Sequence, residues 1–230
     1  MNYERKHIIL FFICTLFLTT FIGCKKDVQT VDMHLNYFGL IPGRYVIYNV
    51  QEMTHDDNVN VHDTLIYQLK TYVGPEYIDN QGRTAREFHR YKRIDSTEDW
   101  VESDVWTAII ENYKAELNDE NQRIIKLVFA PTSDKTWNPN AFNSLPAESY
   151  YYSNIHKPTT IGSLNFDSTL TVEQENFTSL IDFRVKSEKY AANIGLIYKS
   201  FKDLRIANFD SLDVQKGTEI HYTCIGYGFE

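Results

Sequence analysis

Histidine and aspartate gather in one short polar segment of the sequence. His55, Asp56 and Asp57 are followed closely by His62 and Asp63. Imidazole nitrogens and carboxylate oxygens together can hold a divalent cation. The spacing matches neither an EF-hand loop nor the His-Glu-x-x-His pattern of a zinc helix, whereas Asp and Asn are common in hairpin loops because they bond to their own backbone. We therefore interpret the segment as a solvated hairpin loop and predict no metal site.

A second group of residues combines carboxylates with tryptophan. Acids beside aromatic rings are typical of glycosidase clefts, where two carboxylates flank the scissile bond. These acids are neighbours in the sequence, which favours the solvated face of a hairpin over a catalytic cleft. A glycan hydrolase is therefore the third of three functions that we consider for the chain. The acids are Asp95, Glu98, Asp99, Glu102 and Asp104, and the rings are those of Trp100 and Trp106.

Other catalytic signatures are missing from the sequence. It contains neither a Gly-x-Ser-x-Gly elbow nor a Ser-x-x-Lys motif, and ten glycines leave little room for a phosphate-binding loop. His89, His156 and His221 fall in predicted strands, where packed or half-exposed imidazoles are the simpler interpretation. We predict that the protein is not an enzyme, that it has no catalytic residue, and that it uses no cofactor.

Cys24 is the one residue to which the sequence assigns a chemical modification. It closes the tetrapeptide Phe21–Cys24 (FIGC), directly after a charged start and the apolar run Ile8–Ile22. This arrangement resembles the lipobox of bacterial lipoproteins. The resemblance implies that residues 1–23 are a signal peptide and that acyl chains on Cys24 tie the mature protein to a membrane. A plain secreted protein and a signal anchor stay open as alternatives, although 15 residues are fewer than the roughly 20 of a spanning helix.

The segment Glu188–Lys199 carries a second resemblance. Its core, Tyr190–Leu196 (YAANIGL), is similar to a stretch near the C-terminus of Bacteroidota lipoproteins that have no assigned activity. The resemblance implies a β-rich lipoprotein of the cell envelope, anchored to the outer membrane and facing the periplasm or the cell surface. Gly195 allows a sharp turn into the following strand, and we expect Glu188–Asn193 to form one helical turn.

Composition limits the partners of the mature protein. Removal of residues 1–23 leaves 207 residues, with 21 basic and 30 acidic side chains. A net charge of −9 disfavours nucleic acid as a partner. Cys14 leaves with the signal peptide and Cys24 is lipidated, so Cys224 has no intrachain disulfide partner. It lies among alternating apolar residues, and we predict a buried, inert thiol.

The rest of the chain is dominated by signals for strands. In Thr64–Gly74 the residues Leu65, Tyr67, Leu69, Thr71 and Val73 alternate with polar ones and share a face. Turn residues recur every 10–15 positions, and no sustained helical period is present. The predicted fold is mainly β: an antiparallel roll, a sandwich or a partly open barrel with little helix. Further expected elements are strands at Gly43–Val50, Thr84–Ile94, Trp100–Trp106, Leu180–Ser187, Leu196–Ile206 and Thr218–Gly226, and a loop at Met53–His62.

These observations give one organisation and three functions. We expect a signal peptide over 1–23, a tether over 24–36 and a single β-rich domain over 37–230. The favoured function is that of a membrane-anchored, non-catalytic binding or assembly module whose ligand is an unknown protein, glycan or lipid. A carrier of a lipid or small apolar ligand within a curved sheet is the first alternative, and the glycan hydrolase is the second.

Overall fold

The protein is described here as a computed structural model covering residues 30–119 and 122–230. Residues Met33–Glu230 form one compact unit, so its first residues fall in the segment that the sequence assigns to a tether. The predicted signal peptide, the lipobox cysteine Cys24 and residues 25–29 lie outside the described residues.

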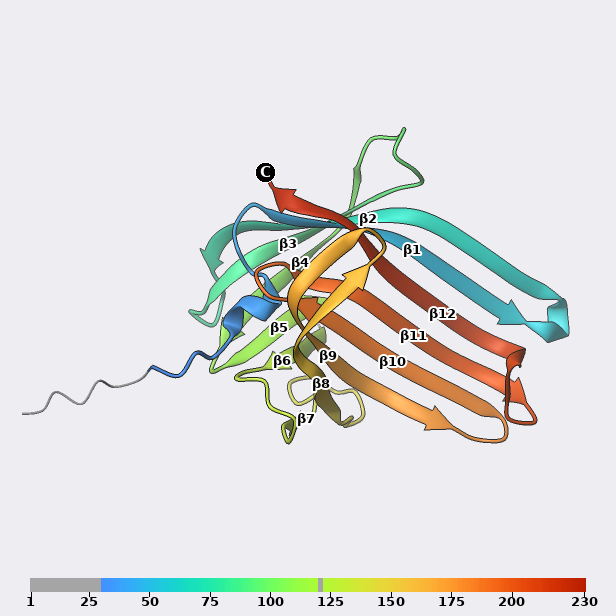
Figure 1. The fold of residues 1–230 in the computed structure, drawn as a ribbon. Helices are drawn as coiled ribbons and strands as arrows, with labels where there is room; N and C mark the ends of the chain where they lie inside the picture. The colour runs from blue at the N-terminus through green and yellow to red at the C-terminus, as the bar shows by residue number, and fades with distance from the viewer. Residues whose placement is uncertain (1–29, 120–121) are drawn as a thin grey trace, which may run out of the picture. The chain divides into compact units, whose positions relative to one another are not determined.

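The compact unit is built almost entirely from β-strands that join in one antiparallel sheet (Figure 1). Two short 3-10 helices, η2 (Leu35–Phe38) and η3 (Asp57–Val59), are the helical elements among the described residues. The mainly antiparallel β fold that the sequence predicts is confirmed. The strands are β1 (Arg44–Asp56), β2 (Val61–Ile78), β3 (Thr84–Arg93), β4 (Val101–Glu111), β5 (Lys114–Asp119), β6 (Gln122–Val128), β7 (Thr136–Trp137), β8 (Tyr150–Ile161), β9 (Leu164–Thr178), β10 (Asp182–Ala191), β11 (Gly195–Ala207) and β12 (Asp210–Phe229).

The sheet consists of two meanders that meet at the chain's first and last strands. Its order is β6-β5-β4-β3-β2-β1-β12-β11-β10-β9-β8-β7. Every neighbouring pair is therefore consecutive in sequence except β1 and β12, which pair along their length from Arg44↔Phe229 to Asp56↔Lys216. This topology leaves β6 and β7, which follow one another in the chain, at the two edges of the sheet.

Side chains of the segment after β6 bring the two edges together. The Trp137 indole Nε1 donates to the carbonyl of Ile125 at 3.1 Å, and the Ile125 amide donates to the carbonyl of Pro139 at 2.9 Å. The Tyr152 hydroxyl of β8 accepts from the Val128 amide at 2.8 Å and donates to the Val128 carbonyl at 3.0 Å. Backbone N–H and C=O groups at the edge of β6 find hydrogen-bond partners in this way. The sheet is nearly closed and barrel-like.

The inner face of β2 follows the alternation in the sequence. Tyr67, Leu69, Thr71 and Val73 are all buried, as predicted. Leu65 has the same parity but is 52 % exposed, because this end of β2 lies where the strands extend beyond the core (Figure 1). Period-two patterning identified the face, but it gave no information on where the core ends.

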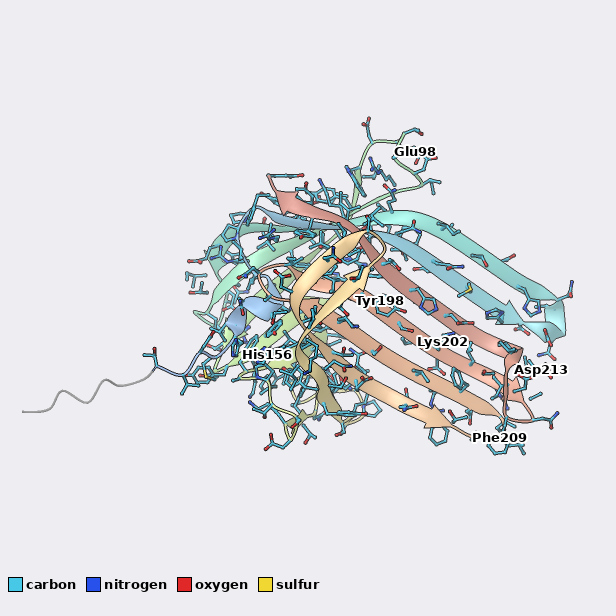
Figure 2. The ribbon with its side chains drawn as sticks, in the orientation of Figure 1. Glu98, His156, Tyr198, Lys202, Phe209 and Asp213 are labelled. Carbon is cyan, nitrogen blue, oxygen red and sulfur yellow. The ribbon has the colours of Figure 1, made fainter. Side chains whose placement is uncertain are left out.

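The far ends of β9, β10, β11 and β12, with the end of β1 and the start of β2, form a long extension of the sheet, which Figure 1 shows running to the right. Here Met53–Asp56 continue β1 and pair with the start of β2, so the sequence-based assignment of a loop over Met53–His62 is wrong. The connection between β1 and β2 consists only of η3 and Asn60. The polar residues on either side of it pair as strands, because strand pairing tolerates polar side chains where both faces of a sheet meet water. Phe209 and Asp213 lie near the far end of this extension (Figure 2).

The helical turn expected over Glu188–Asn193 is also absent, because this segment belongs to β10 as far as Ala191. The turn lies instead over 192–194, where the Ile194 amide donates to the Ala191 carbonyl at 3.1 Å. Asn193 has a φ of 66° and Gly195 a φ of 103°. Both values favour residues that tolerate the left-handed region.

Two clusters of buried apolar side chains fill the concave side of the sheet. One cluster joins η2 to β4–β6 and β8–β10 and includes Phe38, Leu127, Leu170 and Tyr190. The other joins β1 and β2 to β9, β10, β11 and β12 and includes Leu69. Leu196 packs against both, and the region between the clusters contains the cavity described next.

Candidate functional site

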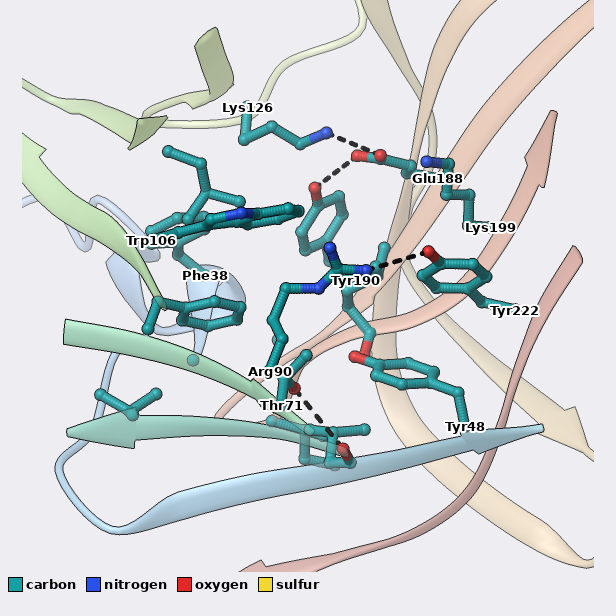
Figure 3. Close-up of a pocket in the computed structure, with 18 of the residues that line it drawn as sticks. Phe38, Tyr48, Thr71, Arg90, Trp106, Lys126, Glu188, Tyr190, Lys199 and Tyr222 are labelled. Atoms are coloured by element: carbon teal, nitrogen blue, oxygen red, sulfur yellow. Dashed lines mark hydrogen bonds and ion pairs between the residues drawn. The ribbon is translucent and has the colours of Figure 1, made fainter. Parts of the chain in front are cut away.

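A cavity of about 200 Å³ lies on the inside of the curved sheet. Its lining is mostly aliphatic and aromatic, with a small number of charged side chains (Figure 3). The apolar and aromatic lining residues are Phe38, Val46, Tyr48, Leu69, Val73, Phe88, Trp106, Leu117, Ile124, Tyr190, Ile194, Leu196 and Tyr222. The charged ones are Arg44, Arg90, Asp119, Lys126, Glu188 and Lys199.

Strand register explains why these residues share one wall. Val73, Phe88 and Trp106 are direct cross-strand partners on β2, β3 and β4. A second row of cross-strand partners lies beside the first and consists of Val46, Thr71 and Arg90 on β1, β2 and β3. Directly opposed residues in an antiparallel sheet project to the same face, so both rows point into the cavity.

The other wall comes from the second meander. Glu188, Lys199 and Tyr222 are successive cross-strand partners on β10, β11 and β12. The Lys199 ammonium lies 5.2 Å from the centroid of the Tyr222 ring, a distance at which a cation is attracted to the ring face. Lys126 from β6 completes this side, and its Nζ is 2.6 Å from Glu188 Oε1 (Figure 3).

Glu188 is a buried carboxylate that remains charged. Its residue is only 3 % exposed, and Tyr190 donates its hydroxyl to Glu188 Oε2 at 2.6 Å. Burial alone would raise the pKa of Glu188, but Lys126 and Lys199, together with these hydrogen bonds, lower it below its usual range. Burial and the neighbouring Glu188 charge raise the pKa of Tyr190, so that its hydroxyl stays protonated and able to donate.

Arg90 is held in the cavity by partners on three sides. Its guanidinium carbon lies 4.1 Å from the centroid of the Trp106 ring. Its Nη2 donates to the Tyr222 hydroxyl at 3.2 Å, and its Nη1 is 3.5 Å from Asp104 Oδ2. The charge of Arg90 is thus balanced within the protein, and its side chain bridges the two walls.

Two N–H donors of the lining differ from Arg90 in their hydrogen bonding. Nε of Arg44 and Nε1 of Trp106 are buried without a hydrogen-bond acceptor in the part of the chain that the structure describes. Arg44 is 9 % exposed, and its guanidinium stacks 3.8 Å from the centroid of the Phe229 ring. Burial lowers the pKa of Arg44 from its ordinary value. Buried donors without acceptors are rare in proteins and costly, so the cavity has capacity for an acceptor.

The histidine and aspartate cluster of the sequence forms pairs on the extension of the sheet. His55 and His62 face each other across β1 and β2, with their Nδ1 atoms 3.1 Å apart. His62 Nε2 is 2.8 Å from Asp57, and His55 Nε2 is 3.5 Å from Glu219. No group of three or more His, Cys, Asp or Glu side chains suited to a metal occurs in the described ranges.

The acids around Trp100 are distributed among separate partners. Asp104 pairs with Arg90 and Glu102 with His89, at 3.5 Å and 2.7 Å respectively. Asp95 Oδ1 accepts from the Thr97 amide and hydroxyl in the turn between β3 and β4. Trp100 lies outside the cavity lining, with the guanidinium of Arg93 4.1 Å from its centroid.

Cys224 is buried at 2 % exposure, as predicted. Burial raises the pKa of its thiol to about 11, which leaves almost no thiolate at neutral pH. The modified cysteine of the sequence, Cys24, lies outside the described residues.

The sequence suggested a carrier with a curved sheet as an alternative function, but it did not identify the residues that line the cavity. Trp106 was noticed only for its acidic neighbours, and Glu188 only as part of the lipoprotein-like segment. Arg44 has the inward parity of Val46, Tyr48 and Val50 on β1, whereas Arg90 lies in a strand that is largely charged and gives no such signal. A charged residue at an inward position of an apolar strand is unexpected. Arg44 therefore departs from the alternation of apolar and polar residues, and this departure is the signal in the sequence that could have pointed to the cavity.

Comparisons with known proteins place few constraints on this chain. It matches no family model, and it matches no curated protein. A solved structure from Parabacteroides distasonis, described as a candidate lipoprotein, aligns over 84 % of this chain and 98 % of its own length, with 10 % sequence identity and a TM-score of 0.38. Among the described residues, helices of the length and apolar character needed to cross a bilayer are absent.

Proposed function

We propose that the protein is a non-catalytic binding lipoprotein of the cell envelope and that its cavity holds a small, mainly apolar ligand. One observation carries the proposal: an apolar, aromatic-lined cavity inside the curved sheet, with N–H donors that find no acceptor in the described part of the chain. Ligand sites in proteins are typically concave, mostly apolar and equipped with a few polar groups that fix orientation. The carrier function predicted from the curved sheet is thus favoured over a module that binds on its outer surface.

The size of the cavity limits the ligand. An engineered apolar cavity of about 150 Å³ admits benzene, and this cavity is about 200 Å³. We therefore expect a body of roughly eight to ten non-hydrogen atoms to be enclosed, while longer molecules would extend toward solvent. Contacts with rings such as those of Phe88 and Trp106 favour a ligand that presents flat or flexible apolar groups.

Anchoring is the second part of the proposal and rests on Cys24. Acylation at this residue would hold the compact unit at the outer membrane, with the tether between them. Each buried methylene of an acyl chain contributes about 0.8 kcal/mol, so two or three chains suffice for stable attachment. A binding protein fixed in this way would collect or release its ligand close to the membrane surface, on the periplasmic or the external side.

Ligand binding is tested on residues 24–230 with Cys24→Ser, purified without detergent. Native mass spectrometry should detect a bound small molecule, or the protein should bind an added solvatochromic dye with a blue-shifted emission. Leu117→Trp fills the cavity from β5 and should abolish dye binding. Val105→Trp on β4 is the matched control, because Val105 is 51 % exposed and dye affinity should be unchanged.

Circular dichroism and thermal melting establish that both variants fold. Equal dye binding by the folded Leu117→Trp and Val105→Trp variants would disprove binding in the cavity. The anchor is tested separately by fractionating cells that express the wild type or full-length Cys24→Ser. Loss of membrane association in the variant is expected, and unchanged association would exclude lipidation as the anchor.

A further inference from the structure

We propose that the ligand carries a single acid group on its apolar body and that Arg44 binds this acid group. The inference rests on the proposed function, because it names the class of molecule that the cavity accepts. Arg44 is the first residue of β1 and lines the cavity. Its side chain is the one cation of the lining that is buried among apolar groups without an acidic partner in the described ranges.

The surroundings of Arg44 are those of an incomplete ion pair. The aromatic face of Phe229, 3.8 Å away, positions the guanidinium, while Nε is shielded from water and has no acceptor among residues 30–119 and 122–230. An arginine side chain stays charged in proteins even when burial lowers its pKa. A buried charge without a partner is strongly unfavourable, and an anion from outside the protein would remove that penalty.

The other cations of the lining are already engaged. Arg90 has Asp104, Trp106 and Tyr222 as partners. Lys126 is paired with Glu188, and Lys199 lowers the pKa of the same carboxylate. Arg44 therefore differs from them, because none of the acids among the described residues is paired with it. A ligand acid placed there would not compete with an ion pair that the described residues form.

Charge and geometry together define the ligand class. Four cationic and two acidic side chains line the cavity, so a positively charged ligand is disfavoured and a singly charged acid is favoured. The planar guanidinium can donate two parallel hydrogen bonds to a carboxylate or a phosphate. Aliphatic and aromatic walls take the remaining, apolar part of the molecule. The ligand is thus an acid with a hydrocarbon body, such as a medium-chain alkyl carboxylate or an alkyl phosphate.

The test compares three molecules that share an eight-carbon chain and differ at the head group. Octanoate, octyl phosphate and 1-octanol are titrated into residues 24–230 with Cys24→Ser, and the dissociation constants are measured by calorimetry at neutral pH. Three further proteins carry Arg44→Gln, Arg44→Lys or Arg86→Gln on the same background. Arg86 is the matched control, because it lies on β3, pairs with Glu76 at 2.6 Å and is absent from the cavity lining.

We expect at least one acid to bind the wild type about tenfold more tightly than 1-octanol, as hydrogen bonds to charged groups allow. The preference should disappear in Arg44→Gln, persist at least in part in Arg44→Lys, and be unchanged in Arg86→Gln. A stronger effect for octanoate or for octyl phosphate identifies the head group as a carboxylate or a phosphate.

Equal affinity of all three molecules for the wild type would overturn the inference and leave the proposed apolar carrier function intact. A preference for acid that survives Arg44→Gln would overturn the assignment to Arg44. Failure of every molecule, together with absence of dye binding, would count against the carrier function itself. The comparison of acid with alcohol on the wild type needs no variant, so it remains decisive if Arg44→Gln does not fold.

Discussion

Lys126 of β6 and Glu188 of β10 form an ion pair of 2.6 Å between the two meanders of the sheet, although 62 residues separate them in sequence. The carboxylate side chain is 4 % exposed and the lysine side chain 16 %. Tyr190 donates a hydrogen bond to the same carboxylate, and the charge of Lys199 lowers the pKa of that carboxylate. This pair ties β6, at one edge of the sheet, to the far wall of the cavity, so the charge pattern of the cavity depends on it.

Removal of one partner should therefore be costly. We expect Lys126→Met to lower the free energy of unfolding by about 3 kcal/mol, because Glu188 is left buried with less compensation. Arg86→Met is the comparison: its pair with Glu76 has the same length of 2.6 Å, but Glu76 is 50 % exposed, and a loss below about 1 kcal/mol is expected. Urea unfolding measures both values, and equal losses would show that burial of the pair has no special role.

Acidification should destabilise the protein partly through Glu188. Its folded-state pKa is lowered, so it contributes stability that is fully present above the unfolded pKa of about 4.3 and is lost as pH falls through the folded value. Urea unfolding at pH 6 and pH 3 should show a decrease in the wild type and a smaller decrease in Glu188→Gln. An identical decrease in both proteins would contradict the lowered pKa.

Gly39 should tolerate no side chain, because η2 approaches the turn after β10 very closely. A Cβ at Gly39 would collide with the backbone of Ile194, and the residue has a φ of 64°. We expect Gly39→Ala to cost at least about 3 kcal/mol from overpacking and backbone strain. Gly82→Ala has the same strain, with a φ of 76°, but meets no atom within 4 Å.

The Gly82→Ala control should lose only about 1–2 kcal/mol. The difference between the two glycine variants, measured by thermal or urea unfolding, isolates the close approach of η2 to the turn. If both variants lose the same amount of stability, the contact between Gly39 and Ile194 is not tight in solution.

Cys224 should react slowly in the folded protein. Burial raises the pKa of the thiol to about 11, and the side chain has little contact with solvent, so both thiolate formation and access are restricted. In residues 24–230 with Cys24→Ser, an aromatic disulfide reagent should label no thiol within minutes at pH 8 and one thiol after addition of urea. Rapid labelling without denaturant would disprove the buried position.

The sequence predicted the fold class because strand alternation is a local property. The inward parity of Tyr67, Leu69 and Val73 is visible within one segment of the chain. The same local evidence failed at Met53–Asp56, where polar residues form paired strand. It also failed at Glu188–Ala191, where a helical turn was expected and β10 continues. In both places the pairing partner, which is not visible in the local sequence, decides the structure.

The sequence by itself determined that the chain forms an antiparallel β unit, predicted the attachment point at Cys24 and identified Cys224 as a core residue. Those conclusions follow from short-range patterns of polarity and turn residues. Tertiary structure alone decided that Arg44, Trp106 and Glu188 meet in one cavity, because β1 pairs with β12 and brings the two meanders face to face. Whether a charged side chain is solvated or buried without a partner depends on that long-range pairing, and the proposed ligand site depends on it as well.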